Sequence, residues 1–108
     1  MKVEKSIVKF TLYLGLNDKE TKQQKIATLE AYKIVSNLIS KRFDGGTIFE
    51  ANGIYKHDNG TIVTEKTLRI EILFAAENDI KEFVSLLKDI FNQESIAVQK
   101  EYVNSELW

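Results

Sequence analysis

Apolar residues along the chain follow two different periods, and each period predicts a type of secondary structure. Residues 6–14 alternate between apolar and mostly polar side chains, which is the pattern of a strand with one buried face. Gly15 follows and is expected to end this strand. The side chains expected to face the core are those of Val8, Phe10, Leu12 and Leu14.

Two other stretches carry apolar residues at helical spacing. The first extends from a capping box at residues 21–24, or from a competing start at residues 17–20, to about Arg42, where residues 44–46 (Asp-Gly-Gly) follow. Glycine accepts the left-handed conformation that often ends a helix, so the Gly pair is interpreted as a helix stop. The second helix is expected to begin at an Asn78 N-cap. Its core stripe consists of Ile80, Phe83, Val84, Leu87 and Phe91.

Between the two helices lie two strand-like runs, residues 47–57 and 61–74, joined by a turn that contains Asn59 and Gly60. Asn-Gly favours a two-residue hairpin loop because both central residues of that turn need a positive φ. This loop predicts a register in which Glu50 faces Arg69. It also predicts that Phe49 and Phe74 belong to the core. A last strand is expected from residue 95 to about residue 103.

The order strand, helix, strand, strand, helix, strand predicts a ferredoxin-like α+β fold over residues 1–108 as one domain. In this arrangement a four-stranded antiparallel sheet carries both helices on one face. The first and third strands are expected in the centre of the sheet, since crossover connections are right-handed. A fold of this kind does not by itself name a function.

The composition excludes several classes of function. The chain has 108 residues, no Cys, one His and a net charge of −1. These counts exclude disulfides, thiolate metal ligands and a multi-histidine metal site within one chain. We therefore expect no metal and no cofactor, and the near-neutral charge argues against general nucleic-acid binding. The charged start and the lack of any 18-residue apolar run indicate a cytoplasmic protein that makes no membrane contact.

Candidate chemistry lies on the sheet face that the helices leave open, which could be solvated surface, a homodimer interface or a ligand platform. Arg69 could anchor a small anionic ligand through its planar guanidinium, or it could pair with Glu50 and Glu71. Tyr13 could stack on a base or sugar, or seal a dimer. The same face is expected to carry Ile54 as an apolar neighbour. The polar side chains assigned to this face are Lys9, Thr11, Glu50, Asn52, Glu65, Thr67, Glu71, Gln99 and Glu101.

Five short segments together resemble a family of small bacterial proteins that is known only as a domain of unknown function. The resemblance extends over roughly residues 8–103. It implies further site residues at Arg42, Thr47, Tyr55, Glu65, Gln93, Glu94 and Ser95. The segments that carry it are residues 12–16, 42–47, 51–55, 60–65 and 91–96.

No catalytic motif accompanies these residues, so the first hypothesis is a non-enzymatic binding module. We expect a homodimer that recognises a small anionic, nucleotide-like metabolite or a protein partner. A second hypothesis is a cofactor-free enzyme of the dimeric α+β barrel type, with Tyr13, His57 or Arg69 lining a cavity between two sheets. A third is a purely structural interaction protein.

Overall fold

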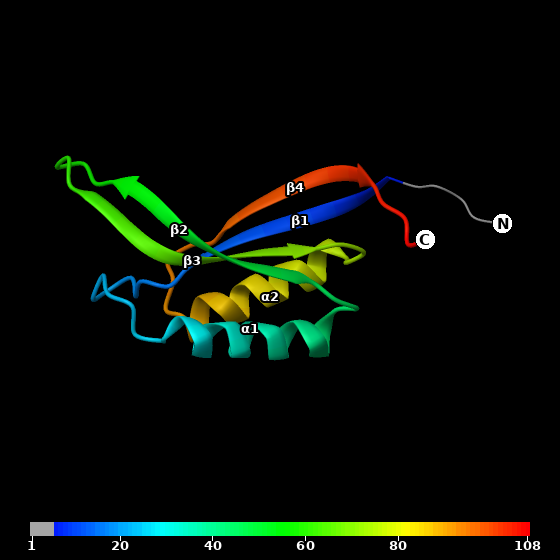
Figure 1. The fold of residues 1–108 in the computed structure, drawn as a ribbon, viewed down its shortest axis with the longest axis horizontal. Coiled ribbons are helices and arrows are strands. Elements are labelled where there is room, and N and C mark those ends of the chain that lie inside the picture. The colour runs from blue at the N-terminus through cyan, green and yellow to red at the C-terminus, as the bar shows by residue number, and fades with distance from the viewer. Residues whose placement is uncertain (1–5) are drawn as a thin grey trace.

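Six elements follow one another in the computed structural model, which describes residues 6–108. The sheet has the strand order β2-β3-β1-β4, with every neighbouring pair antiparallel. Both helices cover the same face of this sheet (Figure 1). The ferredoxin-like α+β prediction, with the first and third strands in the centre, is confirmed. The elements are β1 (Ser6–Gly15), α1 (Thr28–Arg42), β2 (Thr47–Lys56), β3 (Ile62–Ile72), α2 (Glu77–Ile90) and β4 (Ala97–Asn104).

The hydrophobic core lies between the two central strands and the helices. Both central strands place alternate apolar side chains toward the helices, and both helical stripes meet them. Removing one such side chain from water contributes about 1.5–3 kcal/mol. The burial of these side chains confirms the apolar stripes that were predicted for the first strand and the second helix. The buried apolar residues of these four elements are Phe10, Leu12, Leu14, Ala31, Val35, Ile39, Leu68, Ile70, Ile72, Ile80, Phe83 and Leu87.

Both predicted helix starts are wrong, and so is the predicted role of the glycine pair at the end of the first helix. α1 begins at Thr28, because the carboxylate of Asp18 accepts the Glu20 and Thr21 amides and folds the residues before it into a turn. α1 ends at Arg42, as predicted, but Phe43 after it is extended and neither of the two glycines that follow has a positive φ, so the predicted glycine stop does not form. α2 begins at Glu77 after Ala76, so Asn78 lies inside the helix.

The predicted register of the β2–β3 hairpin is also wrong, by one residue. The His57 amide donates to the Thr61 carbonyl at 2.8 Å, and the Gly60 amide donates to the His57 carbonyl at 2.9 Å. These bonds close a three-residue loop in which Gly60 adopts a φ of 88°, the geometry of a type I turn followed by a left-handed residue. Phe49 therefore pairs with Arg69, whereas Glu50 pairs with Leu68.

A shift of one residue moves every β2 side chain to the other side of the sheet. Glu50, Asn52 and Ile54 consequently lie on the side of the sheet that carries the helices, and the prediction that they belong to the open face is wrong. Phe49 and Tyr55 take their place. Phe49 is 42% exposed and Phe74 is 48% exposed, so the prediction that both belong to the core is wrong.

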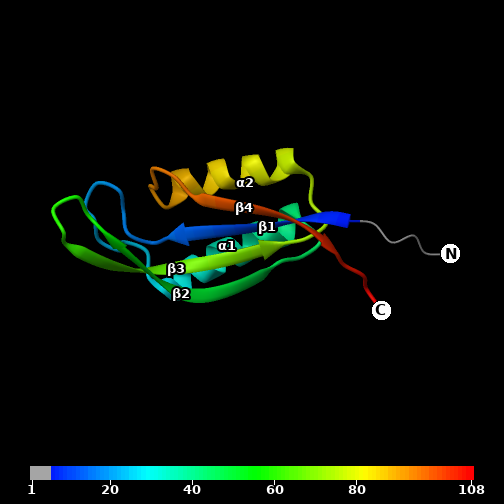
Figure 2. The ribbon, with the colours of Figure 1, turned by 90° about the horizontal axis from the view of Figure 1, so that it is seen from above.

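The β2–β3 hairpin extends well beyond the helices. Its tip rises toward the open side of the sheet (Figure 1), and Figure 2 looks down onto that open side. Within residues 6–108, neither helix is long and apolar enough to cross a membrane.

Candidate functional site

The open face is the side of the sheet opposite the helices. β1, β3 and β4 contribute the side chains that parity predicted, because Tyr13 pairs with Arg69 and Thr11 pairs with Gln99. Thr11 and Thr67, at the centre of this face, are buried. The side chains of the open face include Lys9, Thr11, Tyr13, Thr47, Phe49, Tyr55, Glu65, Thr67, Arg69, Glu71, Gln99 and Glu101.

One half of the open face holds a charge cluster around Arg69. Its guanidinium donates to Glu71 at 2.6 Å and lies 5.2 Å from the centroid of the Phe49 ring. Lys9 lies 3.5 Å from Glu71 and 3.9 Å from Glu101. The expected pair between Arg69 and Glu50 does not form, since Glu50 is on the other side. The Arg69 charge is thus already balanced by a carboxylate.

The other half of the open face holds the carboxylate of Glu65, which is half-buried. Its Oε2 accepts the Asn17 amide at 2.9 Å. Among residues 6–108, Glu65 forms no ion pair. Tyr55 lies diagonally across the hairpin from it. Burial raises the pKa of the Tyr55 hydroxyl above its ordinary value, and the Glu65 charge raises it further.

Two glycines lie beside this carboxylate, and Gly15 leaves the space that it occupies. A Cβ at position 15 would lie 2.6 Å from Oε1 of Glu65, closer than atoms can approach. Gly53 pairs directly with Glu65 across the hairpin. The carboxylate therefore lies flat over the backbone of β1, where a side chain would displace it. We call this group, consisting of Gly15, Gly53, Tyr55, Glu65 and Thr67, the Glu65 site.

A second set of hydrogen bonds fixes the amide that holds Glu65. Gln93 donates from Nε2 to the Asn17 carbonyl at 2.7 Å, so one peptide segment joins Gln93 to the Glu65 carboxylate. Asn92 donates to Asp18 at 2.9 Å, and the Lys19 amide donates to the Asn92 carbonyl at 3.0 Å. These bonds tie the loop after β1 to the turn after α2, and we call them the Asn17 clasp.

The Asn17 clasp also explains why the Asp18 carboxyl stays ionised. Hydrogen bonds from Asn92 and from the Thr21 and Glu20 amides lower the pKa of the Asp18 carboxyl to about 2. A carboxylate held by several donors stays ionised at low pH because each donor favours the charged form. Asp18 therefore keeps its negative charge, and the loop keeps its shape, over the neutral and mildly acidic range.

The remaining residues implied by the family resemblance are dispersed. Gln93 lies behind the open face as part of the Asn17 clasp, and Glu94 and Ser95 are exposed in the turn beside it. Arg42 lies at the end of α1, 3.8 Å from Glu82. Thr47 pairs with Glu71 and so belongs to the open face, but it lies at the opposite end of β2 from the Glu65 site.

His57, the candidate catalytic base of the enzyme hypothesis, contacts the Tyr55 ring edge to face, with the ring centroids 5.5 Å apart. No group of three or more His, Cys, Asp or Glu side chains that could hold a metal ion occurs within residues 6–108.

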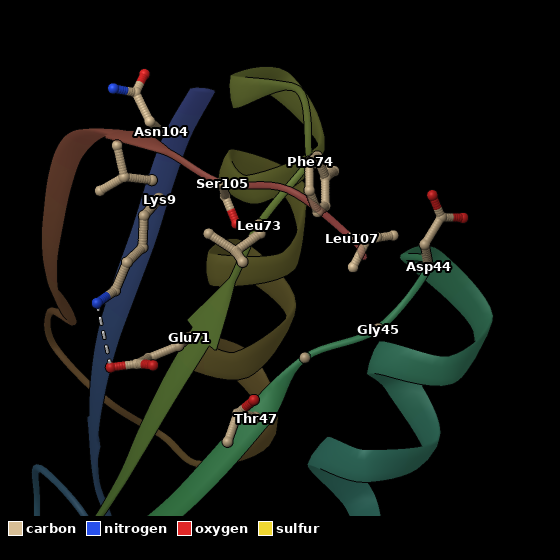
Figure 3. Close-up of a pocket in the computed structure, with 12 residues that line it drawn as sticks. Lys9, Asp44, Gly45, Thr47, Glu71, Leu73, Phe74, Asn104, Ser105 and Leu107 are labelled. Atoms are coloured by element: carbon tan, nitrogen blue, oxygen red, sulfur yellow. Dashed lines mark ion pairs between the residues drawn. The ribbon is translucent and has the colours of Figure 1, made fainter. Parts of the chain in front are cut away.

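A cavity of about 470 Å³ opens where β3 ends and the segment after β4 crosses the sheet (Figure 3). We call it the Phe74 cavity. The sequence pattern did not predict it, because its walls come from three separate connections. Phe74 adopts a left-handed φ of 59°. The principal lining residues are Lys9, Gly45, Thr47, Glu71, Leu73, Phe74, Val103, Ser105 and Leu107.

These features define a small α+β domain of ferredoxin-like fold with a polar and aromatic open face. Residues 9–106 match the family described as Protein of unknown function (DUF3574), and the chain belongs to this family. The family resemblance drawn from the five sequence segments, an unknown-function domain, is thereby confirmed. No curated protein matches the chain.

Two solved structures of a phage enzyme share the fold. A phage SAM lyase in complex with S-methyl-5'-thioadenosine superposes with a TM-score of 0.60 and 18% identity, covering 100% of this chain and 97% of that chain. The same type of protein in its apo state gives a TM-score of 0.64 and 16% identity, covering 100% of this chain and 94% of that chain. At such identities the likeness establishes the fold alone.

Proposed function

We propose that this protein is a homo-oligomeric, non-enzymatic binding module whose open face takes a small nucleoside-like ligand at the Glu65 site. The observation that carries the proposal is the Glu65 carboxylate itself. It is half-buried, held by the Asn17 amide at 2.9 Å, and flanked by two glycines. A carboxylate fixed in this way is ready to accept hydrogen bonds from hydroxyl or amino groups of a ligand.

The surroundings of Glu65 suit a nucleoside better than a nucleotide. Arg69, the expected anchor for an anion, already pairs with Glu71 at 2.6 Å. A phosphate near Glu65 would meet a like charge, which is unfavourable. Tyr55 and Tyr13 offer aromatic rings on which a base can stack, a contact worth about 1–3 kcal/mol in single-strand binding proteins. The full-length fold likeness to a protein that holds S-methyl-5'-thioadenosine supports the same ligand class.

Ligand titration with a matched pair of variants tests this proposal. We expect S-methyl-5'-thioadenosine or adenosine to bind in isothermal titration, and adenosine monophosphate to bind more weakly. Glu65→Gln keeps the shape and removes the charge, and it should weaken binding about tenfold or more, because hydrogen bonds to charged groups contribute about 1.5–3 kcal/mol. Glu101→Gln, the same chemical change on the same face but in the other half, beside Lys9, serves as the control. Equal affinity of Glu65→Gln and the unmodified protein would refute the site.

Self-association is the second part of the proposal. Phe49 and Tyr55 are each 42% exposed on the open face, and aromatic side chains on a sheet face favour burial against another surface. Native mass spectrometry should give a multiple of the 12.4 kDa chain mass. A single species at the chain mass under dilute conditions would contradict it.

A second candidate function is a cofactor-free lyase acting on the same class of ligand. It is favoured by the name of the structurally similar phage protein, which is a SAM lyase. Incubation with SAM and detection of S-methyl-5'-thioadenosine by mass spectrometry distinguishes the two candidates. Product formation that Glu65→Gln abolishes would favour the lyase, whereas binding without product would favour the binding module.

A further inference from the structure

Gln93 lies in the turn after α2, and the end of that helix fixes its backbone. The Gln93 amide donates to the Lys88 carbonyl at 2.9 Å, and the Asn92 amide donates to the Asp89 carbonyl at 3.4 Å. Asn92 adopts a left-handed φ of 48°. These bonds form a Schellman motif, which ends a helix in one defined direction. The side chain of Gln93 therefore starts from a fixed point at the end of α2.

The side-chain amide of Gln93 uses both of its protons. Its Nε2 donates to the Asn17 carbonyl at 2.7 Å and to the Phe91 carbonyl at 3.1 Å. A glutamine amide nitrogen carries two N–H donors, so the two acceptors match the two donors. The bond to Phe91 stays within the turn after α2, whereas the bond to Asn17 reaches the loop after β1. Gln93 thus holds the Asn17 carbonyl from a point that the helix end has fixed.

Asn17 in turn holds the Glu65 carboxylate. Its amide donates to Oε2 of Glu65 at 2.9 Å, so the N–H and the C=O of this one residue are both bonded to side chains. β4 begins at Ala97 and pairs with β1 only as far as Tyr13. The ladder between these two strands therefore ends before it reaches Asn17. A change in the orientation of Asn17 would move the donor that the Glu65 carboxylate depends on.

We propose that Gln93 is a positioning residue for the Glu65 site: by holding the Asn17 carbonyl, it fixes the amide that orients the Glu65 carboxylate toward a ligand. The inference rests on the proposed function and identifies a residue that sets the affinity from behind the open face. A binding group works best when supporting hydrogen bonds fix its geometry before the ligand arrives. Glu65 needs such support because Gly15, over which the carboxylate lies, has no side chain to hold it.

Ligand titration followed by NMR tests whether Gln93 acts through Glu65. Gln93→Met keeps the length of the side chain and removes both donors. With S-methyl-5'-thioadenosine as the ligand, Gln93→Met should raise Kd about three- to tenfold, because residues of one hydrogen-bond network are coupled. In Glu65→Ala no carboxylate remains to be oriented, so adding Gln93→Met should raise Kd by less than about twofold. Gln23→Met, the same change at an exposed position of the loop that contains Asn17, should leave Kd unchanged.

The Asn17 amide proton provides a second readout that needs no ligand. In the unmodified protein this proton is donated to a carboxylate, and such charge-assisted bonds are shorter and stronger than neutral ones. We expect its resonance to move upfield in Gln93→Met, toward its position in Glu65→Ala. Gln23→Met should leave the resonance in place. A loss of overall stability alone would not move this resonance toward that position.

The possible outcomes separate this inference from the proposed function. An unchanged Kd in Gln93→Met, or an equal rise of Kd with and without the Glu65 carboxylate, would overturn the positioning role and leave the proposed function standing. An unmoved Asn17 resonance in Gln93→Met would overturn the positioning role as well. If the unmodified protein binds no S-methyl-5'-thioadenosine while the Asn17 resonance moves as expected, the proposed ligand is wrong and the orientation of Glu65 by Gln93 is supported.

Discussion

Gly15 and Glu65 are predicted to be energetically coupled, because the carboxylate occupies the space that a side chain at position 15 would need. In Gly15→Ala, the new Cβ would lie 2.6 Å from Oε1 and 2.8 Å from Oε2 of Glu65. The carboxylate must swing away and lose the Asn17 amide. Loss of a hydrogen bond to a charged group costs about 1.5–3 kcal/mol, and alanine recovers about 0.5–1 kcal/mol relative to glycine in a strand. We expect a net loss of about 1–2 kcal/mol in the free energy of unfolding.

The sign of the effect should reverse when the carboxylate is absent. In a Glu65→Ala background nothing is displaced, so Gly15→Ala should stabilise the protein by up to about 1 kcal/mol. Urea unfolding of the four proteins of this double-mutant cycle measures the coupling. Gly45→Ala is the matched control, since an added Cβ there meets nothing within 4 Å. Equal effects of Gly15→Ala in both backgrounds, within about 0.5 kcal/mol, would refute the reasoning.

Three further predictions concern the loops. Asp18 titrates at a pKa of about 2 when folded, against an ordinary value of 3.8, so its contribution to stability is present above about pH 4 and is lost toward pH 2. Urea midpoints across this range should vary less in Asp18→Asn. Gly60→Ala should cost about 1–2 kcal/mol in thermal unfolding, because alanine disfavours the φ of 88° that the loop requires. Gln93→Ala should cost about 1 kcal/mol and shift the Asn17 amide resonance, whereas the exposed Gln99→Ala should do neither.

The hydrophobic periods were sufficient to predict the order of the elements and most of the core. Stripes such as Ile80, Phe83 and Leu87 repeat at helical spacing, and only one face of α2 can be buried. The helix ends could not be predicted in the same way. The start of α1 depends on the Asp18 carboxylate, whose donors include Asn92 from the other half of the chain.

The register of the hairpin escaped prediction for a different reason. Both faces of β2 carry one large apolar residue near the core, Ile48 on one side and Phe49 on the other, so the hydrophobic pattern fits either register. Asn59-Gly60 is compatible with a two-residue or a three-residue loop, since Gly60 accepts a positive φ in both. What distinguishes the observed register is Phe49 beneath the Arg69 guanidinium, a contact between strands that no local pattern contains.

Parts of the candidate site were predictable and other parts were not. Alternation along β1 and β3 placed Tyr13, Glu65 and Arg69 on one face. The family resemblance pointed to Glu65 and Gln93, but nothing in the sequence indicated that Asn17 joins them. The hydrogen bond from Gln93 to Asn17 joins residues that are 76 positions apart in the sequence, and the residues between them form most of the fold.

The length of the hairpin loop decides which side chains β2 places on the open face. With three residues, Asp58, Asn59 and Gly60, the open face receives Phe49 and Tyr55. Removing one loop residue while β3 keeps its place would instead bring Glu50, Asn52 and Ile54 to that face, with no substitution in either strand. A single-codon deletion would thus replace two aromatic side chains of the open face by a carboxylate, an amide and an aliphatic side chain, and it would put Phe49 in place of Ile48 on the side that packs against the core.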